Sequence, residues 1–235
     1  MATMFSAWQD VLHRVATATQ TAGRKAGSVQ LIAVGKTYPA ACIRELYECG
    51  QRNFGENYVQ EFVEKYDELE QPCPEIIWHF IGPVQSNKSR WVAERAGWVH
   101  TVDRLKIAER LSIQRPEPMP PLNVCLQVNV SGEASKSGVF PAAVVELACA
   151  VRELPRLTLR GLMAIPAPTQ DKEELARQFA LLCQLRDDLN RQGFALDTLS
   201  MGMSADLELA IAAGATQVRV GTALFGVRDY SNKGL

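Results

Sequence analysis

Short apolar runs alternate along this chain with longer segments in which apolar residues recur at helical spacing. Before the first run, Trp8, Val11 and Val15 mark one face of an opening helix, which Gly23 ends. The run at 31–34, Leu-Ile-Ala-Val, has no polar residue, as expected for a strand buried on both faces of a parallel sheet. Similar runs, some of them short, predict strands at 31–34, 52–54, 76–81, 98–102, 122–130, 157–164, 198–200 and 217–220.

A helical segment follows each predicted strand, and this order favours one (β/α)8 barrel over residues 1–235, with an extra helix at the N-terminus. An open, doubly wound sheet could use the same order of elements. However, the first strand lacks a G-x-G-x-x-G turn, and eight regular units fit a closed barrel better. The proline-dense stretch at 115–121 cannot be helical, and we expect it to form a loop at the bottom of the barrel.

The amino-acid composition indicates which kinds of binding partner to expect. The chain is 47% apolar and 22% charged with a net charge of −1, which is typical of a globular protein and predicts no nucleic-acid or membrane partner. The first residues form neither a signal peptide nor a membrane span, so we expect a cytoplasmic protein. The six cysteines include no C-x-x-C pair and the three histidines are scattered, so we expect no metal site and free, mostly buried thiols.

Polar residues follow several predicted strands, at the end of a barrel where active sites lie. Lys36 comes just after the first strand and would place its ammonium in a mostly dry barrel mouth. Desolvation lowers the pKa of a lysine there, and the neutral amine is the form that captures a carbonyl as a Schiff base. A lysine that merely reaches solvent from a strand end is the alternative. Lys36 alone does not decide between them.

The last two strands predict an anion site. Arg219 and Gly221 point to the same side of the eighth strand, and Gly221 opens the final helix, where backbone N–H groups can face an anion. Thr222, Ser200 and Ser204 could add hydroxyl donors, although Ser204 could equally cap the helix that follows it. Phosphate is often held by the loops after strands seven and eight of a barrel. A lysine that faces such a site fits pyridoxal 5′-phosphate, an aldehyde that carries a phosphate.

The chain resembles the pyridoxal phosphate homeostasis proteins, which are single-barrel relatives of the N-terminal domain of alanine racemase. The resemblance extends from about residue 11 to residue 230 and is carried by the segments LIAVGKTYPA, RNFGENYVQE, WHFIGPVQSNKSR, LRGLMAIP and LSMGMSADLELAIAAGATQVRVGTALFG. It implies that Lys36 carries the cofactor and that Arg219 faces the pyridine nitrogen. It also implies phosphate contacts from Ser200, Ser204, Gly221 and Thr222, and ring contacts from Asn57 and Met201.

The resemblance further implies a protein that binds and buffers pyridoxal phosphate and passes it to apo-enzymes, rather than an enzyme. A permanently charged Arg219 disfavours protonation of the ring nitrogen and leaves the ring a poorer electron sink. Alanine racemases add a second domain and a tyrosine from the partner subunit. We expect neither in this chain, and therefore a monomer. The alternatives are a weak, pyridoxal-phosphate-dependent amino-acid racemase and a cofactor-free Schiff-base aldolase.

Three other features give weaker hypotheses. His79 is expected to be a satisfied core histidine rather than a group in the mouth. Ser86 is expected to cap a helix over 86–96, whose first turn carries Lys88 and Arg90; these cations indicate either a solvated face or an anionic partner. The loop at 131–138 is rich in small residues and should be mobile, and Lys136 within it could receive or release an aldehyde ligand.

Overall fold

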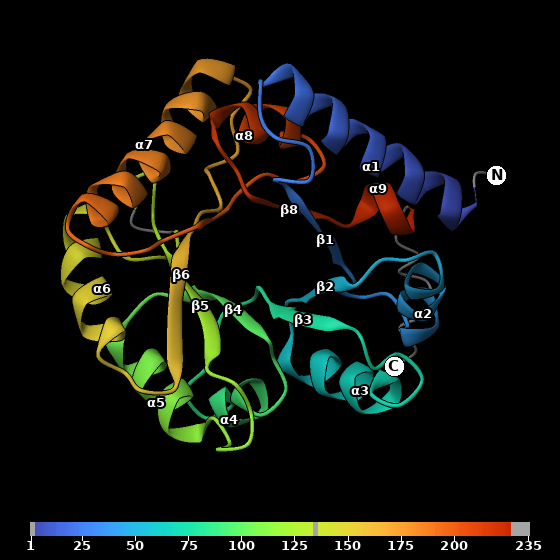
Figure 1. Ribbon diagram of the computed structural model, residues 1–235, viewed down its shortest axis with the longest axis horizontal. Coiled ribbons are helices and arrows are strands. Elements are labelled where there is room, and N and C mark those ends of the chain that lie inside the picture. The colour runs from blue at the N-terminus through green and yellow to red at the C-terminus, as the bar shows by residue number, and fades with distance from the viewer. Residues whose placement is uncertain (1–2, 134–135, 227–235) are drawn as a thin grey trace.

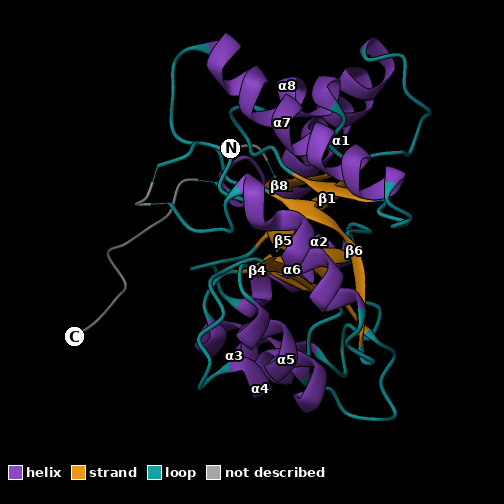
Figure 2. Ribbon diagram, turned by 90° about the vertical axis from the view of Figure 1, so that its left-hand side faces the viewer, coloured by secondary structure: helices purple, strands orange, loops and turns teal. Residues whose placement is uncertain are grey.

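Eight parallel strands pair in chain order and close on themselves in the computed structural model, which describes residues 3–133 and 136–226. Helices surround the strands (Figure 1). In the side view the strands occupy the middle of the molecule, with α1, α7 and α8 on one side and α3, α4 and α5 on the other (Figure 2). The predicted (β/α)8 barrel with an extra N-terminal helix is confirmed.

The elements have the following bounds. The strands are β1 (Gln30–Val34), β2 (Asn53–Glu56), β3 (Ile77–Phe80), β4 (Trp98–Val102), β5 (Leu122–Gln127), β6 (Leu157–Met163), β7 (Thr198–Ser200) and β8 (Gln217–Val220). The helices are α1 (Met4–Thr21), α2 (Ala40–Glu48), α3 (Val59–Leu69), α4 (Ser89–Ala93), α5 (Leu105–Gln114), α6 (Val144–Arg152), α7 (Lys172–Arg191), α8 (Leu207–Ala213) and α9 (Thr222–Phe225), with a 3-10 turn η1 (Pro141–Ala143).

Successive residues of a barrel strand point to opposite faces, so alternate residues pack either inside the barrel or between the strands and the helices. Leu31 and Ala33 of β1 belong to the large apolar cluster between the strands and the helices. Ile32 and Val34 are equally buried but lie outside that cluster, because they face the inside of the barrel. β1 ends at Val34, and Lys36 follows it in the turn that leaves this end of the barrel.

The opening helix α1 covers the seam where the barrel closes. It lies beside α8 and α9 (Figure 1). Arg14 of α1 donates to both carboxylate oxygens of Glu208 and to the carbonyl of Ser204. The helix therefore supports the elements that follow β7 and β8.

Several predicted boundaries were wrong, and hydrogen bonding explains two of them. The helix predicted at 86–96 is only α4, and Ser86 does not cap it, because the hydroxyl of Ser89 donates to the Ser86 carbonyl and closes a separate turn before the helix. β5 ends at Gln127 rather than at residue 130. The amide of Val128 still donates to the carbonyl of Met163 on β6, but the amide of Asn129 donates to the carbonyl of Val139 instead, so the chain leaves its β6 partner at this point.

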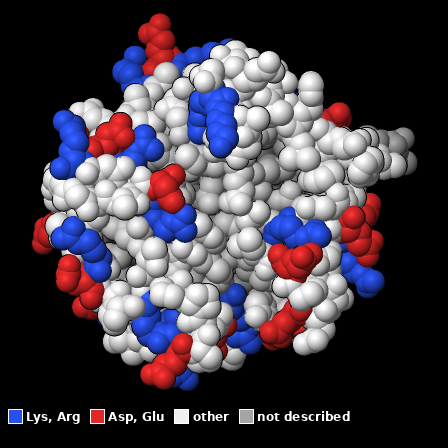
Figure 3. All heavy atoms as spheres, in the orientation of Figure 1, with Lys and Arg blue, Asp and Glu red and all other residues white. Residues whose placement is uncertain are grey.

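The burial of the thiols differs from expectation. All six cysteines are free, but only Cys73 and Cys125 are buried and Cys149 is exposed, so the expectation of mostly buried thiols was wrong. Lysine and arginine are interspersed with aspartate and glutamate on the face seen in Figure 3. Among the described helices, none combines the length and apolar character needed to cross a membrane.

Candidate functional site

The first and last strands bring the predicted lysine and anion site together. β1 pairs with β8, with Ala33 opposite Val220. A Cβ atom on Gly221 would lie 3.2 Å from the carbonyl oxygen of Val34, so the two chain segments leave the barrel side by side. Lys36 is half-buried two residues beyond Val34, and Gly221 immediately precedes α9. The structure thus places Lys36 and Thr222 at the ends of adjacent strands.

Arg219 is buried just below this mouth. Its Nη1 atom donates to Oγ of Ser200 at 2.7 Å, and its Nη2 atom donates to the carbonyl oxygen of Ala164 at 2.9 Å. Burial lowers the pKa of Arg219 to about 10, which still leaves the guanidinium charged at neutral pH. Within the described residues, no carboxylate forms an ion pair with it. The mouth therefore has a buried positive charge beneath it.

A line of hydrogen bonds runs from Arg219 across the barrel interior. Oγ of Ser200 lies 2.8 Å from Nδ1 of His100, Nε2 of His100 lies 2.9 Å from Nδ1 of His79, and Nε2 of His79 lies 3.0 Å from Oδ1 of Asn53. One proton arrangement satisfies every atom. The serine hydroxyl donates to His100, His100 donates to His79, and His79 donates to Asn53.

Both histidines in this line are neutral. Burial lowers the pKa of His79 to about 3. Burial, with the nearby His79 and Arg219, lowers the pKa of His100 well below its ordinary value. The prediction of a satisfied core histidine at position 79 is confirmed. The sequence analysis missed His100, although its period-two spacing from Trp98 on β4 could have indicated that both side chains face inward.

The structure separates the other predicted residues of β7. Ser200 is fully buried and its hydroxyl is engaged by Arg219 and His100. Met201 has no exposed surface and belongs to the apolar cluster between strands and helices. Ser204 does not cap α8, which begins at Leu207 behind Asp206. The carboxylate of Asp206 accepts from the amide of Met203 and closes a turn ahead of the helix, so the capping interpretation was wrong.

Asn57 and Thr37 present polar atoms at the mouth without partners. Oδ1 of Asn57 and Oγ1 of Thr37 are buried and make no hydrogen bond. Asn57 follows β2, and its backbone presses against Gly82 after β3, where a Cβ atom would lie 1.8 Å from the Asn57 carbonyl oxygen. Buried polar atoms are seldom left unpaired, so both atoms have unused hydrogen-bonding capacity.

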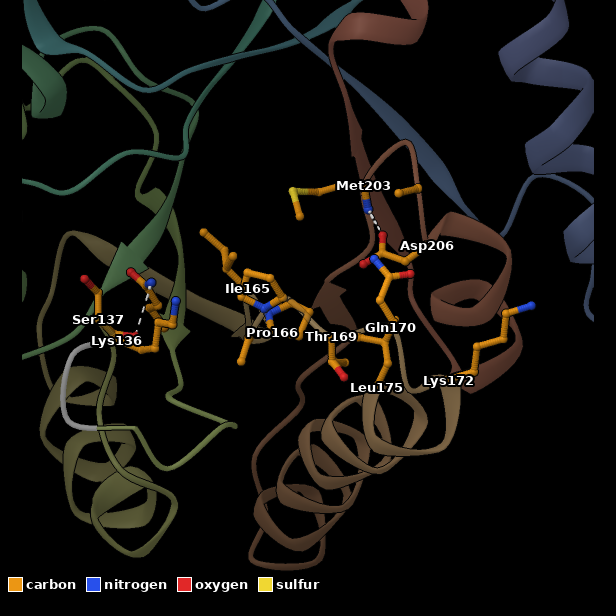
Figure 4. Close-up of a pocket in the computed structure, with 14 residues that line it drawn as sticks. Lys136, Ser137, Ile165, Pro166, Thr169, Gln170, Lys172, Leu175, Met203 and Asp206 are labelled. Carbon is orange, nitrogen blue, oxygen red and sulfur yellow. Dashed lines mark hydrogen bonds between the residues drawn. The ribbon is translucent and has the colours of Figure 1, made fainter.

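A cavity of about 730 Å³ opens between the loops that follow β5, β6 and β7. Lys136 and Ser137 form one wall, and Met203 and Asp206 stand across from them, with Ile165 between (Figure 4). The predicted loop lysine therefore lines a cavity, although residues 134–135 of its loop lie outside the described part of the chain.

The Lys88 and Arg90 pair lies apart from these groups. Lys88 is exposed ahead of α4, and the 70% exposed side chain of Arg90 is 3.8 Å from the carboxylate of Glu94. This favours the solvated-face interpretation. No group of three histidine, cysteine, aspartate or glutamate side chains suited to a metal ion occurs over residues 3–133 and 136–226.

Comparison with known proteins identifies the family to which the chain belongs. Residues 9–229 match the family model "Alanine racemase, N-terminal domain". The pyridoxal phosphate homeostasis protein of Pseudomonas aeruginosa is 60% identical over 220 residues, covering 94% of each chain, and that of Escherichia coli is 53% identical over 227 residues, covering 95% of this chain and 96% of its own. The solved structure of PipY from Synechococcus elongatus with pyridoxal phosphate bound is 40% identical, covers 90% of this chain and all of its own, and superimposes with a TM-score of 0.79. The chain belongs to the pyridoxal phosphate homeostasis protein family, within the alanine racemase N-terminal domain class of barrels.

Proposed function

We propose that this chain binds pyridoxal 5′-phosphate as a Schiff base on Lys36 and serves as a reservoir that passes the cofactor to apo-enzymes, without significant turnover. The names of the relatives and the pyridoxal phosphate in the PipY structure support the choice of ligand. The cytoplasmic location and the monomeric state predicted from the sequence remain part of this proposal.

One observation carries the proposal: the half-buried Lys36 and the side-chain-free Gly221 leave adjacent strands above a buried guanidinium that forms no ion pair with a carboxylate of residues 3–133 or 136–226. A buried positive charge of this kind favours an anionic ligand, because the surrounding low dielectric screens it poorly. Gly221 lets a phosphate approach the backbone of the turn into α9. The unpartnered Oδ1 of Asn57 would accept a hydrogen bond from a hydroxyl or another donor group of the same ligand, not from its phosphate.

The chain's own residues suit binding better than turnover. Pyridoxal phosphate supplies an aldehyde and an electron-withdrawing ring. Lys36 would hold the aldehyde carbon, and Arg219 would donate to the ring nitrogen while its fixed charge opposes protonation of that atom. Each ring nitrogen of His79 and His100 is already hydrogen-bonded within the barrel. Neither histidine is therefore poised to act as a base on a bound amino acid.

The direct test is the absorbance spectrum of the protein mixed with pyridoxal phosphate, before and after borohydride, with peptide mapping of the reduced lysine. We expect a Schiff-base band and reduction at Lys36. The band should be absent in Lys36→Ala and retained in Lys25→Ala, an exposed lysine on a different loop. Reduction at another lysine, or a band that survives in Lys36→Ala, would contradict the proposal. A protein that forms no band would favour the cofactor-free aldolase.

Turnover and transfer need separate measurements. Incubation of the loaded protein with L-alanine should leave optical rotation unchanged, and sustained racemisation would make the chain an enzyme. Mixing the loaded protein with an apo-enzyme should restore that enzyme's activity faster than the release of cofactor into buffer allows. The Lys136→Ala variant tests the loop lysine in the same assay, and an unchanged transfer rate would exclude a role for it.

A further inference from the structure

A buried charged cluster lies behind Lys36, on the side of β1 that faces α3. It consists of Glu56, the last residue of β2, with Glu61 and Lys65 of α3. Nζ of Lys65 donates to Oε1 of Glu56 at 2.8 Å and to Oε2 of Glu61 at 3.2 Å. The side chains of Glu56 and Lys65 are 0% and 8% exposed, so this is an ion cluster held inside the protein.

Side chains of the cluster also form hydrogen bonds with the backbone on both sides of Lys36. Nζ of Lys65 donates to the carbonyl oxygen of Gly35 at 2.8 Å. Oε2 of Glu61 accepts from the amide of Thr37 at 2.7 Å. The residue before Lys36 and the residue after it are therefore both hydrogen-bonded to the same pair of α3 side chains.

The backbone conformation of residues 35–37 explains why these hydrogen bonds are needed. Thr37 has a φ of 69°, a left-handed conformation that is unfavourable for a β-branched residue and costs about 1–3 kcal/mol. Gly35 has no room for a side chain, because a Cβ atom there would lie 2.7 Å from Oε1 of Glu56. The turn at residues 35–37 is thus held in a strained shape by the side chains of Glu61 and Lys65 and is packed against Glu56.

The cost of the cluster argues against a purely stabilising role. Burial raises the pKa of Glu56 to about 7, against the lowering effect of Lys65, so ionising this carboxyl costs more in the folded protein than it does in water. Oε2 of Glu56 is buried without a hydrogen-bond partner. Apolar residues of similar volume would often serve stability equally well at such a site.

We propose that Glu61 and Lys65, supported by Glu56, are positioning residues for Lys36: they fix the turn that carries it, so that its amine enters the mouth along one direction. This inference rests on the proposed function, because it assigns the cluster to Schiff-base formation at Lys36. Loss of these hydrogen bonds to the turn should slow Schiff-base formation by the Lys36 amine while leaving the phosphate site intact.

Glu61→Ala tests this, because Glu61 is at the cluster's partly exposed edge and its removal leaves Lys65 paired with Glu56. Two ligands separate reaction from binding: pyridoxal phosphate, whose Schiff-base band is followed by stopped flow, and pyridoxine 5′-phosphate, which carries an alcohol in place of the aldehyde and cannot react. We expect Schiff-base formation to slow by about tenfold or more, since small misplacements of a reacting group are costly, with pyridoxine phosphate affinity unchanged. Glu61→Gln keeps an oxygen that can accept from Thr37 and should restore most of the rate, and Glu68→Ala, exposed on the same helix, should behave as wild type.

The outcomes distinguish this inference from the function on which it rests. A wild-type protein without a Lys36-dependent band would overturn the proposed function and the inference together. A wild-type band with an equal rate in Glu61→Ala would overturn the inference alone. Parallel losses of reaction rate and of pyridoxine phosphate affinity would also overturn it, because they would indicate general damage to the mouth.

Discussion

At the scale of single residues, the buried guanidinium of Arg219 is oriented by a line of hydrogen bonds to uncharged groups. Among the residues that the structure describes, the partners of the two terminal nitrogens of Arg219 are a serine hydroxyl and a backbone carbonyl, and His100 in turn orients the serine. A carboxylate in that position would neutralise the charge and weaken the attraction for an anion. Uncharged acceptors orient the guanidinium and leave its charge for the ligand.

Ser200 is the residue on which this arrangement depends. We expect Ser200→Ala to lower the free energy of unfolding by about 1–3 kcal/mol, because a donor of Arg219 and Nδ1 of His100 then lose their partner where water does not reach. Ser28 is a matched control, since its buried hydroxyl has no hydrogen-bond partner. Ser28→Ala should change stability by no more than about 0.5 kcal/mol. Urea denaturation of both variants measures the difference, and equal losses would contradict the assigned role.

At this scale, the sequence predicts which residues lie together where position on a strand decides it. Lys36, Arg219 and Gly221 could be grouped because the ends of parallel barrel strands meet and alternate residues share a face. The partners of Arg219 could not be predicted, because His100 is 100 residues from Ser200 in the chain. The position of Glu56, which ends β2 and belongs to a buried ion cluster with Lys65, could not be predicted either.

At the scale of elements, the strands were easier to predict than the turns around them. Strands 98–102, 198–200 and 217–220 have the bounds expected from the sequence. An apolar strand is specified by its own residues, but the start of a helix depends on which side chain closes the preceding turn. Ser89 and Asp206 close those turns at α4 and α8, where Ser86 had been expected to cap the helix and capping was one of two alternatives for Ser204.

The loops at the mouth are packed against one another more tightly than loops on an open surface. Gly82, after β3, touches the backbone of Asn57, after β2, and a methyl group at Gly82 would overlap the Asn57 carbonyl. Gly82→Ala should therefore destabilise the protein by about 1–3 kcal/mol and weaken ligand binding by displacing Asn57. Gly97 has only ordinary contacts at 3.5 Å or more, so Gly97→Ala is the control and should cost less than about 1 kcal/mol. Similar thermal midpoints for the two variants would show that the loops separate easily.

At the scale of the whole molecule, the barrel interior carries titrating groups whose effects on stability oppose one another. His79 and His100 have lowered pKa values, so the unfolded chain binds their protons first and stability falls as the pH drops below about 6.5. Glu56 has a raised pKa of about 7, so the folded chain keeps its proton longer and stability falls as the pH rises from about 4.5 to 7. Between about pH 4.5 and 6.5, the unfolded chain binds two protons on these histidines that the folded chain does not, and the folded chain binds one on Glu56 that the unfolded chain does not. The net effect on the slope of stability against pH is that of one proton.

Removing one histidine should therefore change the slope of stability against pH, in addition to any fixed loss of stability. The slope for wild type below pH 6 includes about 1.4 kcal/mol per pH unit from each buried neutral histidine. We expect His100→Gln to reduce the slope by about that amount between pH 4 and 6, as measured by urea denaturation at a series of pH values. His13→Gln, on the exposed face of α1, is the control for the substitution itself and should leave the slope as in wild type. A slope in His100→Gln equal to that of wild type would mean that the histidine line is protonated within the folded barrel, and the hydrogen-bond direction from Ser200 to Asn53 would then have to be reversed or broken.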